Sequence, residues 1–322
     1  MGGVADEQDT ATAHRIMRHL VDGAEVNRSV VRQQLQGFWR RVAKIREALA
    51  KSAAPAANRI VEWLIRVHLG EAVDLAAAHG NQPEKSARGP HHGPRREVCL
   101  ADLNEAGARK AAVEIGAEGQ AIACAVDVTD RSAVKQMVRR TAAAFGQLDV
   151  IFNNAGIAEI KPFLEVTEED WNRVMRINAL GVLICMQEAA RQMIAQGKGG
   201  KIVNTSSIAG REGVGLQPHY CASKACVISL TQAGAREFGQ HGITVNAFCP
   251  GCVDTDLYEN LKKNMHDRGL SHIPGEYAQR IVLGQRIATP DDVLGLATFL
   301  ASDESDYITG QSILVDGGYL II

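Results

Sequence analysis

From residue 97 onward, short apolar runs alternate along the chain with amphipathic segments. Apolar runs of four to eight residues predict buried strands, and apolar residues spaced three to four apart predict helices. The predicted strands cover 98–103, 121–128, 150–156, 201–207 and 244–251, with a last strand inside 290–318. The predicted helices cover about 104–116, 130–146, 168–196, 220–240 and the start of 290–318. This alternation is typical of an α/β protein with a doubly wound parallel sheet.

The first ninety-six residues follow a different pattern. Helices are predicted over 11–22 and 28–51, and the second carries an apolar stripe in steps of four and three. A third helical run within 58–78 offers that stripe a partner, so residues 1–78 are interpreted as a helical N-terminal segment, a small hairpin of helices. Residues 79–96 combine proline and glycine without periodicity and predict a linker. The basic face of 28–51 is an alternative binding surface, although a charged face is usually only solvated.

Composition is that of an ordinary globular protein, with 46% apolar and 22% charged residues. No apolar run approaches the ~18 residues of a membrane-spanning helix. The acidic N-terminus, with Asp6 and Glu7, carries no readable secretory or mitochondrial address, so the expected location is cytoplasmic. Residues 1–96 hold 15 Lys and Arg against 10 Asp and Glu, and the remainder holds 20 against 27. The two parts therefore have opposite net charges. Neither a membrane nor a nucleic acid is expected as a partner of this chain.

Seven cysteines in apolar surroundings suit buried thiols in a reducing compartment. Cys249-Pro-Gly-Cys252 matches the spacing of thiol redox enzymes or half of a metal site, but a single such motif is weak evidence. The adjacent His91 and His92 have no nearby cysteine or acidic partners. No metal site is predicted.

The strongest chemical signal is Tyr220-x-x-x-Lys224, with Ser207 thirteen residues before the tyrosine at a predicted strand end. Positions four apart share one face of a helix, so the Lys224 ammonium is expected beside the Tyr220 phenol. A free phenol has a pKa of about 10, and a nearby cation lowers this pKa by favouring the phenolate. Tyr220 would then serve as a general acid and base near neutral pH. In the alternative interpretation, Tyr220, Lys224 and Ser207 are an aromatic residue, a surface charge and a turn serine that take part in no common reaction.

In this setting of strands and helices, the motif resembles the short-chain dehydrogenase/reductase family, a Rossmann-like fold, over about residues 97–322. The resemblance implies hydride transfer between a nicotinamide cofactor and a secondary alcohol or ketone. It implies that Ser207 polarises the substrate oxygen, that Tyr220 exchanges its proton, and that Lys224 lowers the Tyr220 pKa and binds the nicotinamide ribose. It adds Asn178 as a fourth catalytic position, which would hold a water linking Lys224 to solvent.

Polar residues at the strand ends supply a candidate cofactor site, because ligands of an open parallel sheet bind at the carboxyl ends of its strands. Asp102 ends the first strand, where an acid fits the adenosine ribose hydroxyls and favours NAD over NADP. The resemblance assigns the next strand ends to the adenine pocket and the cofactor rim, and a Pro-Gly-x-x-x-Thr motif to the nicotinamide and diphosphate. The residues are Asp127, Val128, Asn154, Ala155, Gly156, Pro250, Gly251, Val253 and Thr255, together with Tyr220 and Lys224.

One expected part is not found. The family begins with a strand and a Thr-Gly-x-x-x-Gly-x-Gly turn whose main-chain N–H groups receive the diphosphate. That turn should lie about 18 to 24 residues before Asp102, where residues 78–84 are AHGNQPE. The fold is therefore predicted to lack a recognisable first βα unit. Three explanations stay open: an enzyme with an unusual diphosphate grip and impaired activity, a non-catalytic binding protein, or a truncated, fused or frame-altered reductase.

Residues 256–285 lie where this fold carries its substrate lid. The sequence resembles reductases of sugar alcohols and small diols in the segment GITVNAFCPGCVDTDLY and in KACVISLTQ before it. A 3-oxoacyl thioester reductase is the second enzyme candidate. The expected partners are a small alcohol or ketone and further copies of the chain. The resemblance implies that the helices around Asn178 and Tyr220 pair in a homodimer or homotetramer.

Overall fold

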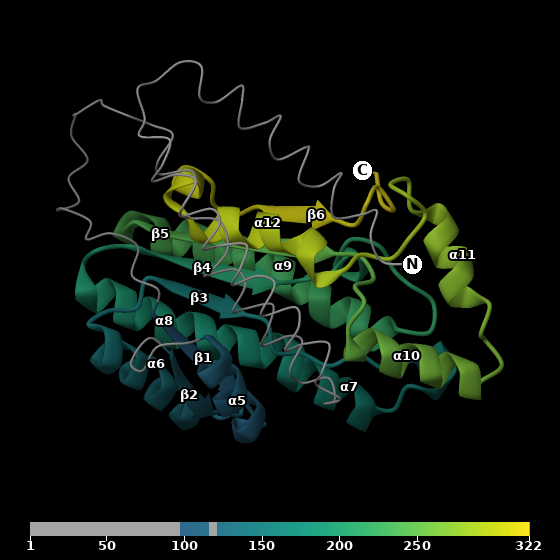
Figure 1. Cartoon of the computed structure of the whole chain (residues 1–322), viewed down its shortest axis with the longest axis horizontal. Helices are drawn as coiled ribbons and strands as arrows, with labels where there is room; N and C mark the ends of the chain where they lie inside the picture. The colour runs from purple at the N-terminus through teal and green to yellow at the C-terminus, as the bar shows by residue number, and fades with distance from the viewer. Residues whose placement is uncertain (1–96, 116–120, 322) are drawn as a thin grey trace, which may run out of the picture. The chain divides into compact units, whose positions relative to one another are not determined.

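The computed structural model describes residues 97–115 and 121–321, and Figure 1 shows how their helices and strands are arranged. The helical segment predicted over 1–78 and the linker predicted over 79–96 lie outside the described residues. The described strands are β1 (Val98–Asp102), β2 (Ala121–Ala125), β3 (Val150–Asn153), β4 (Gly200–Thr205), β5 (Ile243–Pro250) and β6 (Ser312–Val315). The described α-helices are α5 (Glu105–Ile115), α6 (Arg131–Phe145), α7 (Glu168–Met175), α8 (Gly181–Gln196), α9 (Pro218–Phe238), α10 (Asp256–Asp267), α11 (Ile273–Arg280) and α12 (Pro290–Ala301). The predicted alternation of strands and helices is confirmed.

All strand pairs are parallel, and they fall into two groups. β3, β4, β5 and β6 form one sheet in that order, and β1 pairs with β2 in another. A doubly wound sheet places its first strand between the second and the fourth. β1 and β3 hold the second and fourth places, and no strand of the described residues lies between them. The break in the sheet therefore falls where the unrecognised first strand would be.

Helices cover both faces of the strands. Successive strand residues face opposite sides, so on β4 Ile202 packs in the core shared with α6 and α8, whereas Val203 packs against α12. On β1, Cys99 packs against that shared core and Leu100 packs under α5. The core is thus continuous on the face of α6, α8 and α9, and it is divided into two clusters on the face of α5 and α12.

Two local features differ from expectation or add to it. The helix predicted over 168–196 is α7, a π-helical turn η2 (Arg176–Leu180) and then α8. A π-turn inserts an extra residue per turn and is frequent at functional sites. The lid range 256–285 contains two helices, α10 and α11, which the sequence patterns did not predict.

Candidate active site

The site is built where β3, β4 and β5 end, because the carboxyl ends of parallel strands meet at one edge of the sheet (Figure 1). β4 ends at Thr205, and Ser206 and Ser207 follow directly. α9 begins at Pro218, whose missing N–H costs nothing in a first helical turn. Tyr220 therefore lies in the first turn of α9, next to the end of β4.

The structure brings Ser207 and Tyr220 together. Ser207 is buried, and its hydroxyl accepts a hydrogen bond from the Ala209 N–H at 3.1 Å, which fixes the side chain at the start of a short 3₁₀ turn. Burial raises the pKa of Tyr220 to about 12, and a hydrogen bond with the Ser207 side chain opposes that rise. The two hydroxyls thus form the hydrogen-bonding pair that the sequence placed at one site.

Lys224 lies over the Tyr220 ring, with its Nζ 5.8 Å from the ring centroid. The ammonium donates a hydrogen bond to the Thr205 carbonyl at 2.8 Å, and burial lowers the pKa of Lys224 to about 8. The Lys224 ammonium is thus directed to a main-chain carbonyl, and burial is the largest influence on the pKa of the phenol. That Lys224 lowers the Tyr220 pKa during the reaction stays a prediction.

Two residues that the sequence reasoning did not single out hold α9 against β4. The Ser206 hydroxyl donates to the Lys224 carbonyl at 2.8 Å. A Cβ on Gly210 would lie 2.7 Å from both the carbonyl carbon and the oxygen of Lys224, so only glycine permits this approach. The motif TSS at the end of the predicted strand could have indicated a role for Ser206. No sequence pattern pointed to Gly210.

Asn178 is fully buried in the π-turn η2. Its Oδ1 accepts from the Ile157 N–H at 2.8 Å, and its Nδ2 donates to the Ile157 carbonyl at 2.8 Å and to the Ser223 hydroxyl at 3.0 Å. The side chain thereby joins the loop after β3 to α9. Since these contacts occupy the amide, a water-holding role of Asn178 would use its main chain.

The segment after β3 lies beside Lys224. Thr205 donates its hydroxyl hydrogen to Asn154 Oδ1 at 2.9 Å, and Ala155 and Gly156 continue the loop. A Cβ on Gly156 would lie 3.2 Å from Asn178 Oδ1 and 3.6 Å from Lys224 Nζ. Because Gly156 has no side chain, its main chain lies close to Lys224 and is open to a group bound at the rim of the site.

A buried chain of polar side chains under the site was also missed by the sequence reasoning. Asn153 Nδ2 donates to Asn204 Oδ1 at 2.8 Å, and Asn204 Nδ2 donates to the Thr231 hydroxyl at 2.9 Å. Asn153 Oδ1 is buried without a hydrogen-bond partner. These partners come from β3, β4 and α9, and a buried polar network of this kind rigidifies the elements that carry it.

The predicted adenosine-side residues lie at the ends of the other sheet. Asp102 Oδ1 accepts from the Asn104 N–H at 2.8 Å. Asp127 is exposed and accepts from the Thr129 N–H at 2.8 Å, a contact that lowers the pKa of Asp127. Val128 meets the start of α8, because a Cβ on Gly181 would lie 2.7 Å from Val128 Cγ2.

The turn after β5 carries the Pro-Gly-x-x-x-Thr motif. The N–H of Gly251, which follows Pro250, donates to the Val315 carbonyl at 3.3 Å, and Val253 bridges to Ala288. The Thr255 hydroxyl donates to the Val253 carbonyl at 3.2 Å and makes no hydrogen bond to the first turn of α10. The turn is thus fixed to β6 and to the segment before α12.

The thiols of Cys249 and Cys252 do not have the electrostatics of a redox pair. Burial raises the pKa of Cys249, and it raises the pKa of Cys252 to about 11. Reactive CxxC thiols have lowered pKa values, because the thiolate is the nucleophile. No group of three or more potential metal ligands occurs in the part of the chain that the structure describes. Within the same residues, no helix has the length and apolar character to cross a membrane.

A nicotinamide cofactor fits one half of this site. Its nicotinamide and ribose would lie between Tyr220, Lys224, the Gly156 rim and the turn at Gly251, where hydroxyl, ammonium and close main chain converge. The diphosphate half is not matched, since the sequence ahead of Asp102 contains no Thr-Gly-x-x-x-Gly-x-Gly turn. Among the described residues, Tyr220 and Lys224 would hold the nicotinamide end of such a cofactor, and Asp102 would hold its adenosine ribose.

The fold and the site define a class of protein, the α/β proteins with a doubly wound parallel sheet and a Ser-Tyr-Lys group at its carboxyl edge. Residues 94–320 match the family model described as enoyl-(acyl carrier protein) reductase. The chain belongs to the short-chain dehydrogenase/reductase family, whose dehydrogenases are oxidoreductases acting on alcohol groups with nicotinamide cofactors.

Three similar proteins illustrate the relationship. The chain is 41% identical to sorbitol dehydrogenase of Cereibacter sphaeroides over 225 residues, which cover 69% of this chain and 86% of that one. It is 42% identical to the (S)-acetoin-forming diacetyl reductase of Staphylococcus epidermidis over 226 residues, 69% and 88% of the two chains. A solved short-chain type dehydrogenase/reductase from Mycobacterium marinum is 34% identical, with a TM-score of 0.64 over 70% of this chain and 86% of that chain.

Proposed function

We propose that this chain is an NAD-dependent oxidoreductase that interconverts a secondary alcohol of the polyol or diol kind and the corresponding ketone. The observation that carries the proposal is the hydrogen-bonded pair Ser207 and Tyr220 beside the buried Lys224, at the carboxyl ends of parallel strands. A phenol flanked by a hydroxyl and a cation is an arrangement for moving one proton to or from a substrate oxygen.

In this proposal Ser207 binds and polarises the substrate oxygen. At neutral pH the Tyr220 phenol, with its pKa of about 12, carries its proton and donates it to the oxygen of a ketone that is being reduced. In the reverse direction the alcohol proton passes to Tyr220 as phenolate, a form that the charge of Lys224 favours. The carbon exchanges its hydride with the nicotinamide ring, the chemistry that the cofactor supplies when bound.

NAD rather than NADP is proposed because Asp102 places a carboxylate at the end of β1, where a 2′-phosphate would be repelled. Fluorescence titration of NADH and NADPH tests this. We expect saturable binding of NADH at least about tenfold tighter than that of NADPH, and a smaller ratio for Asp102→Ala. Equal affinities would contradict the choice of NAD. Absence of saturable binding by either would favour the non-catalytic or truncated alternative, which the missing diphosphate turn supports.

The polyol or diol class is proposed because the similar proteins include a sorbitol dehydrogenase and an acetoin-forming diacetyl reductase. The family model's description names an enoyl-(acyl carrier protein) reductase, which shares the acyl thioester but reduces a carbon–carbon double bond. A 3-oxoacyl thioester reductase stays the second enzyme candidate from the sequence. We would assay NAD-dependent oxidation of sorbitol and 2,3-butanediol against reduction of a 3-oxoacyl thioester. Turnover confined to the thioester would overturn the proposed substrate class.

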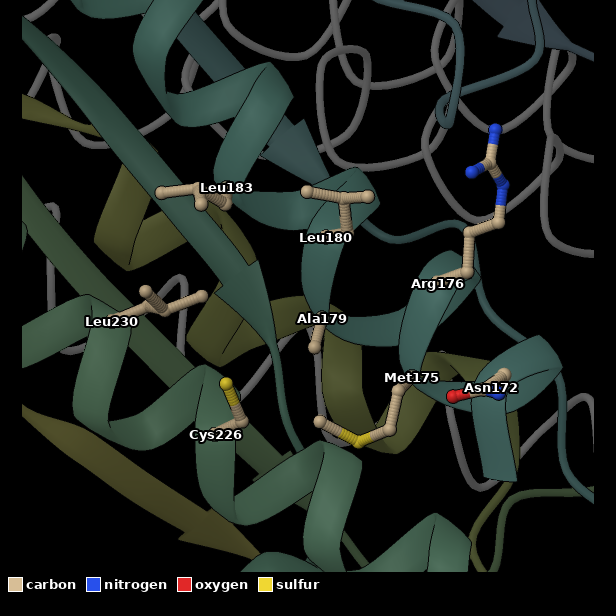
Figure 2. Close-up of a pocket in the computed structure, with 8 residues that line it drawn as sticks. All are labelled: Asn172, Met175, Arg176, Ala179, Leu180, Leu183, Cys226 and Leu230. Atoms are coloured by element: carbon tan, nitrogen blue, oxygen red, sulfur yellow. The ribbon is translucent and has the colours of Figure 1, made fainter. Parts of the chain in front are cut away.

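We propose that α8 and α9 form the pairing face of a homodimer or homotetramer. A hollow of about 380 Å³ lies between α7, η2, α8 and α9, and Figure 2 shows its mainly apolar lining. None of the candidate catalytic residues lines it, so it is not the substrate site. Its lining includes Leu183 and Leu230 from facing helices, and Leu180 is 39% exposed. Leu230→Glu is expected to lower the sedimenting mass, and an unchanged mass would contradict this face.

The domain organisation and location complete the proposal. We propose a catalytic domain over 97–322 with its lid at 256–285, preceded by a helical segment over 1–78 and a linker over 79–96. Limited proteolysis should then cut first within 79–96, and early cleavage inside 97–322 would contradict it. A cytoplasmic location is supported by the seven cysteines, which are all free thiols.

A further inference from the structure

The proposed lid is fastened to the C-terminal tail by a stack of aromatic and cationic side chains. The rings of Tyr277, on α11, and Tyr319, in the tail, are stacked with centroids 4.3 Å apart and an interplanar angle of 21°. The guanidinium of Arg280, one turn further along α11, lies 4.3 Å from the Tyr319 centroid. Stacking and cation–π contacts of this kind stabilise the arrangement of the three side chains beyond simple burial.

The tail that carries Tyr319 is itself held rigidly. Asp316 is buried, and its carboxylate accepts from the N–H groups of Gly318 at 3.0 Å and Leu320 at 2.9 Å. Gly317 and Gly318 have φ values of +66° and +80°, which side chains other than glycine rarely adopt. The Gly317 carbonyl also accepts from the Leu283 N–H at 2.9 Å. The tail therefore offers α11 a fixed platform.

The hydroxyl of Tyr277 connects this platform to the active-site turn. Tyr277 Oη accepts a hydrogen bond from the Cys252 N–H at 3.0 Å. A Cβ on Gly251 would lie 2.8 Å from Tyr277 Oη and 3.1 Å from Asp316 Cβ. Gly251 is thus surrounded by the lid and the tail at once, and the turn after β5 has the shape that these two neighbours allow.

The turn held by Tyr277 adjoins the candidate acid/base. β5 pairs with β4 as far as Thr205 and Phe248, and the Ser206 N–H donates to the Phe248 carbonyl at 2.9 Å, so the Gly251–Cys252 turn and Ser207 follow neighbouring strands at one edge of the sheet. A charge on Cys252 would raise the pKa values of Tyr220, Tyr258 and Tyr277, in keeping with this placement. Burial keeps Cys252 protonated, with a pKa of about 11, so its side chain is an uncharged wall of the site. A shift of the Cys252 main chain would therefore move this wall.

We propose that Tyr277 is a positioning residue, which fixes the Gly251–Cys252 turn through its hydroxyl and thereby sets the wall of the substrate site beside Tyr220. Its ring, held on Tyr319, makes the position of this wall depend on the position of the lid. Tyr277 does not touch the reacting atoms in this role. The catalytic consequence rests on the proposed alcohol oxidation, whereas the structural link does not.

Tyr277→Phe tests the link, because it removes one oxygen and keeps the ring on Tyr319. In hydrogen exchange read at single amides, the Cys252 N–H should exchange about tenfold faster, as expected for losing one hydrogen bond. Amides of α11 should keep their rates. Tyr258→Phe is the matched control: Tyr258 is buried near the same thiol, and the change should leave the Cys252 amide unaltered. An unchanged Cys252 amide in Tyr277→Phe would overturn the proposal.

Kinetics and a second variant separate positioning from general stability. Tyr277→Phe should raise the KM for the alcohol severalfold while kcat and its pH profile change less than about twofold. Tyr319→Leu should speed exchange in both α11 and Cys252, and Tyr319→Phe should restore wild-type rates. If the wild-type protein oxidised no alcohol, the proposed function would be contradicted. The positioning role of Tyr277 would then be tested by the hydrogen-exchange result alone. A fall in kcat with constant KM would contradict the positioning role.

Discussion

At the scale of single residues, burial moves the pKa values of the two central groups, Tyr220 and Lys224, apart. It raises the pKa of Tyr220 to about 12 and lowers that of Lys224 to about 8. Both shifts favour the uncharged form, as desolvation requires. Without a bound substrate, the Tyr220 phenol is therefore protonated at pH 7. The neighbouring Lys224 amine is cationic at that pH and loses its proton at a lower pH than an ordinary lysine.

Tyr220→Phe should remove turnover and leave the fold intact. The variant loses the hydroxyl that is proposed to exchange a proton with the substrate, so kcat/KM should fall about 10²–10⁴-fold. The free energy of unfolding should change by roughly 1 kcal/mol or less, since one hydrogen bond is lost and the ring remains. Tyr307→Phe, on a fully exposed residue, is the control. Activity retained by Tyr220→Phe would show that the acid/base is misassigned.

Lys224→Met should make the protein more stable at neutral pH. The folded pKa of about 8 lies below the ordinary 10.5, so between these values the unfolded chain binds a proton that the folded chain does not. Wild-type stability therefore falls as pH falls from 10.5 to 8, by up to about 3 kcal/mol. The advantage of Lys224→Met should be small near pH 10 and largest below pH 8. Denaturant unfolding at pH 7, 9 and 10 measures it, and a constant difference would contradict the shift.

The residues of the site were predictable to different extents. Ser207, Tyr220 and Lys224 follow from spacing and strand ends, because one helix and one strand carry them. The links from Asn204 to Asn153 and Thr231 join residues 51 and 27 positions apart. Such contacts depend on how elements pack, and no local pattern records them.

At the scale of elements, α9 owes its position to contacts of its main chain with the turn after β4. Gly210→Ala should place a Cβ 2.7 Å from the carbonyl group of Lys224, which is main chain and cannot move aside. We expect a loss of roughly 1–3 kcal/mol in the free energy of unfolding and reduced turnover, because Lys224 is displaced. Gly213→Ala is the matched control, since nothing lies within 4 Å of its Cβ. Equal melting temperatures for the two variants would contradict this docking.

Strands and amphipathic helices of this part were predicted within a few residues, since each depends on a local period of two or 3.6. The π-turn η2 was not predicted, because the periodicity of the flanking helices continues across 168–196 and conceals the one extra residue. That turn nevertheless sets the direction of the buried Asn178 side chain toward Ile157. The helices α10 and α11 of the lid were missed for another reason: few of their side chains are buried, so their apolar pattern is weak.

At the scale of the whole described part, the break between β1 and β3 is the main departure from a doubly wound sheet. The sequence holds no recognisable glycine-rich turn ahead of Asp102, and the described residues hold no strand between β1 and β3. The α6 and α8 face still joins both sheets through a common core. Within the described residues, Asp102 is therefore connected to the Ser207 and Tyr220 pair mainly through helices.

Hydrogen exchange should accordingly divide the described strands into two groups. A two-stranded sheet is marginally stable by itself, whereas β4 and β5 lie inside a four-stranded sheet. Leu100 on β1 and Val203 on β4 are each 1% exposed, so side-chain burial alone predicts equal protection. We expect hydrogen-bonded amides of β1 and β2 to exchange at least about a hundredfold faster than those of β4 and β5, through local opening that spares the larger sheet. Equal protection throughout would show that β1 and β2 are stabilised as firmly as an unbroken sheet.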